Sequence, residues 1–60
     1  MLADRICYRP DEAAAVMGTS RDVIFKLLAA GELRSFRAGR VRLIPADALR
    51  EYVQRKLDEA

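Results

Sequence analysis

Hydrophobic and polar positions in the first half of the chain recur with a helical period and predict two short helices. A proline and two acidic residues precede a short apolar face in residues 10–17, and Gly18 ends it, which is typical of a helix of about two turns. Ser20 is a favourable N-cap for a second helix, in which apolar residues again recur at helical spacing. We expect this second helix to run from Arg21 to Ala30, with Gly31 as its C-terminal glycine.

Between residues 35 and 44 apolar and polar residues alternate, and this period of two predicts strands. Gly39 lies in the middle of this segment and predicts the turn of a two-stranded hairpin. The hairpin would have one apolar and one arginine-rich face, formed by Phe36, Ala38, Val41 and Leu43 and by Arg37, Arg40 and Arg42. Because two strands alone are marginally stable in water, we expect the apolar face to pack on the helices.

A third helix is predicted after the hairpin, opened by Pro45 and continuing through Leu57. Its apolar stripe consists of Ala48, Leu49, Tyr52, Val53 and Leu57. Glu51 and Arg55 have the i, i+4 spacing of a helical ion pair. At the other end of the chain, the apolar run at residues 6–8 is interpreted as an extended lead-in to the first helix.

The length of 60 residues allows one small domain, which we expect to span residues 1–60. Hydrophobic residues make up 52% of the chain and charged residues 33%, a balance typical of a folded domain. Barrels and doubly wound sheets need far more residues, so the large catalytic scaffolds are excluded by length.

The side chains available also limit the chemistry. The sequence has no histidine and one cysteine, Cys7, so a Cys/His zinc site and an intrachain disulfide are both excluded. The usual general base is missing as well. We therefore expect no enzyme activity, no metal, no cofactor and no small-molecule ligand. The longest uncharged run, Ala13–Ser20, is too short to cross a bilayer, and the absence of disulfides favours a cytoplasmic protein.

Positive charge is concentrated in the middle of the chain. Residues 21–42 contain six basic residues against two acidic ones, whereas residues 1–20 and residues 43–60 each hold one more acidic residue than basic. The six are Arg21, Lys26, Arg34, Arg37, Arg40 and Arg42. Arginine suits forked recognition of phosphates and guanine edges. Charge alone leaves two interpretations about equally open, a solvated basic face and a surface that binds a polyanion.

The order of the predicted elements favours the second interpretation. Two short helices joined by a tight turn at Gly18 and Thr19 are typical of a helix-turn-helix, whose second helix enters the major groove of DNA. The arginine-bearing hairpin that follows has the form of a wing, which can reach phosphates or the minor groove. The expected fold class is thus α+β, mainly α: a small winged helix-turn-helix with a two-stranded wing and a C-terminal third helix.

Short motifs spaced along most of the chain are similar to a known family. They are residues 8–14 (YRPDEAA), 18–21 (GTSR), 31–33 (GEL), 39–40 (GR) and 43–45 (LIP). Together they resemble the excisionase-type helix-turn-helix domains, small winged modules related to the DNA-binding head of the MerR family. The resemblance covers about Tyr8 to Val53. It implies sequence-specific binding of double-stranded DNA, with the second helix in the major groove and the hairpin as wing.

The resemblance also implies which residues contact DNA. The base-facing positions match Asp22 and Lys26, with Arg21 and Val23 beside them, while Ser20 is a cap that also approaches the DNA backbone. Wing contacts are expected from Arg37, Arg40 and Arg42, and Arg34 of the same basic segment completes the predicted set.

Individual positions keep alternative roles or depart from the family pattern. Asp22 could instead suit the positive start of its helix, and Phe25 is expected to pack rather than to stack on DNA. Arg9 stands where the family usually has a Thr or Ser cap, so the cap of the first helix is expected to be weaker. Lys26 is often Arg in relatives, which predicts a less strict contact with guanine.

The resemblance favours a recombination directionality factor of a phage or integrative element, an excisionase. Such a protein would bind adjacent sites by head-to-tail self-association and bend DNA, so that a site-specific integrase partner performs excision. It would be encoded by a bacterium or a phage and would lie on the nucleoid when bound. The alternative is a small MerR-like transcriptional regulator, which is disfavoured because the chain stops soon after its third helix. A third hypothesis is an adaptor whose basic face binds an acidic protein partner.

Overall fold

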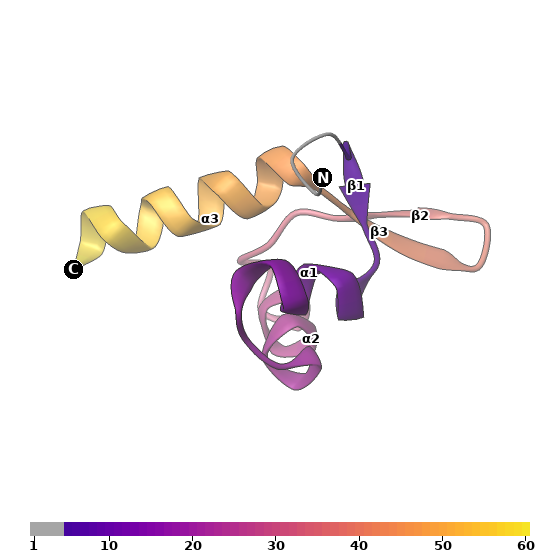
Figure 1. Cartoon of the computed structure of the whole chain (residues 1–60), viewed down its shortest axis with the longest axis horizontal. Helices are drawn as coiled ribbons and strands as arrows, with labels where there is room; N and C mark the ends of the chain where they lie inside the picture. The colour runs from indigo at the N-terminus through magenta and orange to yellow at the C-terminus, as the bar shows by residue number, and fades with distance from the viewer. Residues whose placement is uncertain (1–4) are drawn as a thin grey trace.

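The computed structural model describes residues 5–60, which form helices and a small sheet in the order strand, two helices, two strands, helix (Figure 1). The helices are α1 (Pro10–Met17), α2 (Arg21–Ala29) and α3 (Ala46–Glu59). The strands are β1 (Cys7–Tyr8), β2 (Phe36–Ala38) and β3 (Val41–Pro45). The predicted fold class is confirmed, and each predicted helix lies within two residues of its expected bounds.

The turn between α1 and α2 is built from local hydrogen bonds. Gly18 adopts a left-handed conformation with φ of 73°, which a side chain would strain. Its N–H donates to the carbonyl of Ala15, and the N–H of Thr19 donates to the carbonyl of Ala14. This pair of bonds is a Schellman motif and ends α1. Ser20 then caps α2, its hydroxyl accepting the N–H of Val23 at 3.3 Å, as predicted.

The start of α1 has a different cap. Among the described residues, the side chain of Arg9 forms no capping hydrogen bond, which confirms the weaker cap expected there. Compensation comes from Glu12, whose carboxylate accepts the N–H of Arg9 at 2.9 Å. Pro10 occupies the first turn, where its missing N–H costs no hydrogen bond.

The sheet has one more strand than predicted. β2 and β3 form the expected antiparallel hairpin, called the wing below, with Phe36 opposite Leu43 and Arg37 opposite Arg42. On its other edge β3 also pairs with β1, where Tyr8 lies opposite Ile44. The extended lead-in is therefore an edge strand, and it fixes the wing to the start of α1.

The core lies where α1, α2 and the start of α3 meet the inner end of the sheet. Its buried residues are small or aliphatic, with one aromatic ring: Tyr8, Ala13, Ala14, Ile24, Leu33, Ile44, Ala46, Ala48 and Leu49. Ile24 and Ile44 are fully buried, and Met17, Leu27, Leu28 and Tyr52 pack around the core. The alanines of α1 let the helices approach closely in so short a chain.

The expectation that the apolar face of the wing packs on the helices is wrong. Side chains alternate along β3, so buried Ile44 lies on the same face as Arg42, and Val41 and Leu43 lie on the opposite face. Phe36, which pairs with Leu43, is 45% exposed. The wing extends beyond the helices in Figure 1, so little of it can cover the core.

The two ends of α3 differ in their surroundings. Ala48 and Leu49 are buried, whereas Val53 is 43% and Leu57 63% exposed, so only the first part of the predicted stripe lies in the core. The second half of the helix extends away from α1 and the sheet in Figure 1, and its Arg55 and Lys56 contact Glu32 in the segment after α2.

The ion pair expected within α3 is also wrong. Glu51 does not bind Arg55 but accepts two hydrogen bonds from Arg34. Arg55 donates instead to the carbonyl of Glu32. In both cases a residue outside α3 competes for the partner that helical spacing alone would assign. Among residues 5–60, no helix has the length and apolar character to cross a membrane.

Candidate nucleic-acid interface

Basic side chains divide into two groups according to their partners. The first group forms ion pairs with carboxylates, all between side chains that are at least one-third exposed: Arg5 with Glu12 (2.7 Å), Arg34 with Glu51 (3.0 Å), Arg50 with Asp47 (2.9 Å) and Lys56 with Glu32 (3.0 Å). Arg55 is held by the Glu32 carbonyl and lies over the Tyr52 ring. These pairs neutralise one acidic residue of α1, Glu12, and most of the charged residues in the first three turns of α3.

The second group has no carboxylate partner. Within residues 5–60, six basic side chains form no ion pair and lie outside α3; they are called the unpaired basic set below. They are Arg9, Arg21, Lys26, Arg37, Arg40 and Arg42. One precedes α1, two lie on α2 and three lie on the wing. The basic side chains of α2 and of the wing, the two elements expected to contact DNA, therefore all lack an ion pair among the described residues.

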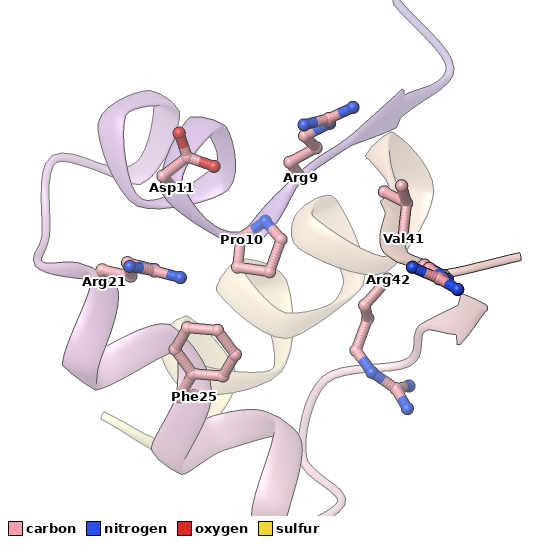
Figure 2. A pocket seen from close by; sticks show the side chains of 8 residues that line it. Arg9, Pro10, Asp11, Arg21, Phe25, Val41 and Arg42 are labelled. Carbon is pink, nitrogen blue, oxygen red and sulfur yellow. The ribbon is translucent and has the colours of Figure 1, made fainter. Parts of the chain in front are cut away.

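Part of the unpaired basic set surrounds a cleft between the helices and the wing (Figure 2). The cleft has a volume of about 350 Å³ and is lined by Arg9, Pro10, Asp11, Arg21, Phe25, Arg40, Val41 and Arg42. Arg21 lies over the Phe25 ring, its guanidinium carbon 5.1 Å from the ring centre. A second hollow of about 280 Å³ shares Phe25 and Arg42 with this cleft and continues along α2 past Leu28 and Ala29.

Helix α2 turns a complete face away from the core. Asp22, Phe25, Lys26 and Ala29 are all exposed and follow the i, i+3, i+4, i+7 spacing of one helical face. Ile24 is buried on the opposite side. Val23 is 39% exposed and adjoins this face.

The wing places two arginines opposite each other on neighbouring strands. Arg37 and Arg42 are cross-strand partners, and like charges in directly opposite positions repel one another. Arg42 is oriented by a hydrogen bond of 2.8 Å to the hydroxyl of Ser35. Arg40 follows Gly39 in the turn, where it is exposed. An anion bound between these groups would remove their repulsion.

Three predicted site residues form side-chain hydrogen bonds inside the protein. The Ser20 hydroxyl accepts the N–H of Val23, and the Arg34 guanidinium donates to both oxygens of Glu51. The partly buried Arg42 donates to Ser35, and the other six predicted residues are exposed.

The predicted site leaves out Arg9 and Phe25, which both line the cleft. The sequence pattern identifies Arg9 only as a poor cap, although a basic residue immediately before a helix-opening proline is a signal in its own right. Phe25 was expected to pack, but it is 43% exposed.

Neighbouring groups strongly favour the ionised form of Glu12 in the first turn of α1. The Arg5 guanidinium, followed by the N–H of Arg9, lowers the pKa of Glu12 to about 2. The same contact raises the pKa of Arg5. The Glu12 carboxylate thus binds Arg5 and the backbone N–H of Arg9. It forms no ion pair with the Arg9 side chain. Among the described residues there is no group of acidic and sulfur ligands that could hold a metal ion.

Comparison with known proteins agrees with this arrangement. The family model described as "Helix-turn-helix domain" matches residues 7–57. A protein of Saccharopolyspora erythraea named "Probable excisionase" is 39% identical over 54 residues, which cover 90% of this chain and 55% of that protein. The chain thus spans about half the length of this relative. No solved structure matches the chain. The chain belongs to the helix-turn-helix domain family, and its resemblance to the excisionase type is confirmed.

Proposed function

We propose that this chain binds double-stranded DNA in a sequence-specific manner, without catalysis. The observation that supports this most directly is the distribution of the unpaired basic set. Ion pairs neutralise Arg50 and Lys56 of α3, whereas the basic residues at the start of α1, on α2 and on the wing form none within the described part of the chain. Neutralisation of DNA phosphates by such side chains releases counterions and supplies most of the affinity of DNA-binding domains.

Within this interface α2 would read the bases. Its exposed face offers Asp22 to a cytosine amino group and Lys26 to the acceptors of guanine, with Arg21 and Val23 alongside. Ser20 would approach the backbone through its hydroxyl, which accepts the N–H of Val23 and keeps its O–H donor for a phosphate. Arg37, Arg40 and Arg42 would contact phosphates or the minor groove. Arg34 would make no direct contact with DNA, because both oxygens of Glu51 hold its guanidinium.

We further propose that the biological role is that of an excisionase. Similarity to the named excisionase of Saccharopolyspora erythraea supports this, together with the small size of the domain. One copy with a single reading helix covers few base pairs, so useful affinity requires neighbouring copies. Head-to-tail binding at adjacent sites would bend the DNA and favour excision by a partner integrase.

Selection of binding sites from a random duplex pool, followed by sequencing, tests these proposals. Direct repeats separated by about one helical turn are expected, because head-to-tail copies keep the same orientation. Inverted repeats would instead indicate a symmetric dimer and support a transcriptional regulator. Failure to enrich any sequence would contradict DNA reading and leave the adaptor with an acidic protein partner as the better hypothesis.

A further inference from the structure

Base reading by α2 and backbone contact by the wing leave the cleft between them without a role. We propose, resting on the DNA-binding function above, that this cleft seats one sugar–phosphate strand of the duplex. Arg9, which belongs to no predicted contact, would bind its phosphate together with Arg21, Arg40 and Arg42.

Duplex geometry places a backbone strand at this position. The major and minor grooves of B-DNA are separated by a single sugar–phosphate strand at each boundary. A domain that inserts α2 into the major groove and reaches the adjacent minor groove with its wing must straddle that strand. The surface between these two elements is the cleft, since its lining includes Arg21 and Phe25 of α2 and Val41 and Arg42 of β3.

The lining of the cleft matches the chemistry of such a strand. Arg9, Arg21, Arg40 and Arg42 provide four guanidinium groups, which bind phosphate oxygens through paired N–H donors. The apolar part of the lining consists of Pro10, Phe25 and Val41 and suits the faces of deoxyribose rings. Asp11 contributes one opposing charge, but its carboxylate points away from the Phe25 ring in Figure 2.

Phe25 has a positioning role in this arrangement. Its ring lies under the Arg21 guanidinium at 5.1 Å and is 43% exposed within the cleft lining. Stacking on an aromatic ring restricts an arginine without using its N–H donors, so Arg21 reaches the phosphate already oriented. A leucine at this position would keep the apolar surface but would lose the stack.

A methylphosphonate scan tests the proposal on a duplex obtained by site selection. Each phosphate in turn is replaced by its uncharged analogue, and binding by the full chain is measured. We expect one or two phosphates at the groove boundary at which the replacement weakens wild-type binding by about tenfold. In Arg9→Ala the same replacement should have little further effect, and the slope of log K against log salt should be less steep by about one.

Three further variants complete the test. Arg40→Ala should lose sensitivity to the same phosphate, and Phe25→Leu should lose part of it. Arg50→Ala is the matched control, because Arg50 lies on α3, paired with Asp47 and outside the cleft. It should behave like wild type in both assays. Helical circular dichroism confirms that each variant is folded.

The outcomes separate this proposal from the proposed function. If the wild-type chain selects no duplex, DNA reading itself is contradicted. If it selects a duplex but Arg9→Ala and Arg40→Ala keep the wild-type phosphate sensitivity and salt slope, the cleft does not hold the backbone and only this inference is overturned.

Discussion

Lys26 lies one helical turn after Asp22 on the exposed face of α2, with no carboxylate partner among the described residues. Its ammonium group is therefore available to a guanine edge in the major groove. We predict that Lys26→Ala weakens binding to the selected site by about 1–3 kcal/mol and relaxes base preference at one position. Titration of duplexes with single base changes measures both effects. Unchanged affinity and unchanged preference would mean that α2 does not read bases through Lys26.

Other residues of the interface could not be predicted one by one. Arg9 and Phe25 belong to it only because the start of α1 folds against α2 and β3, and no local periodicity reports that contact. Arg34 illustrates the opposite case. In the sequence it looks equivalent to Arg37, but its charge is matched by Glu51, 17 positions along the chain. Composition locates a basic segment, whereas tertiary contacts decide which of its charges stay unpaired.

The turn between α1 and α2 sets the angle between the two helices and depends on one backbone conformation. A Cβ at Gly18 would meet no atom within 4 Å, so a substitution there costs backbone strain and no steric clash. We predict that Gly18→Ala destabilises the fold by about 1–2 kcal/mol, the penalty of a left-handed conformation. Gly18→Asn, which tolerates that conformation better, should cost less. Urea unfolding measures both, and equal stability of the alanine variant and wild type would contradict the Schellman turn.

Arg40 of the wing and Arg34 of the segment before the wing also differ in a way that binding can measure. We predict that Arg40→Ala weakens binding to all sequences alike and flattens the salt slope by about one, since a phosphate contact has no base preference. Arg34→Ala should leave the slope nearly unchanged and alter stability by at most about 1 kcal/mol, because its ion pair with Glu51 is exposed. A loss confined to one sequence in Arg40→Ala, or a full unit of slope lost in Arg34→Ala, would reverse these assignments.

Elements long enough to show a period were predictable, and shorter ones were not. α1, α2, the wing and α3 each repeat apolar positions often enough to reveal their type. β1 has two residues, too few for alternation, and its pairing with β3 is a long-range contact. The orientation of the wing was hidden for a different reason. Each face of the wing continues into apolar residues, so the sequence does not show which face turns toward the core. The burial of Ile44 in the structure identifies that face.

At the scale of the whole molecule, three carboxylates form ion pairs between segments that are separate in the sequence. Glu12 joins the N-terminal arm to α1 through Arg5, and Glu51 and Glu32 join the segment after α2 to α3 through Arg34 and Lys56. A 60-residue chain has a thin core, so contacts of this kind matter more than in a larger domain. The unpaired basic set takes no part in these ion pairs, so the proposed interface and the ion pairs use separate basic residues.

The contacts of Glu12 predict how the free energy of unfolding depends on pH. The pKa of Glu12 is lowered from 4.5 to about 2 in the folded chain, so the unfolded chain takes up a proton first as pH falls. The stabilisation is complete above pH 4.5 and is lost as pH falls toward 2. We predict that Glu12→Gln removes part of the decline in the free energy of unfolding over this window. Arg5→Ala should remove less of it, because the N–H of Arg9 still binds the carboxylate. Urea unfolding at a series of pH values measures these slopes. Parallel curves for wild type and Glu12→Gln between pH 4.5 and 2 would show that the Glu12 contacts do not persist in solution.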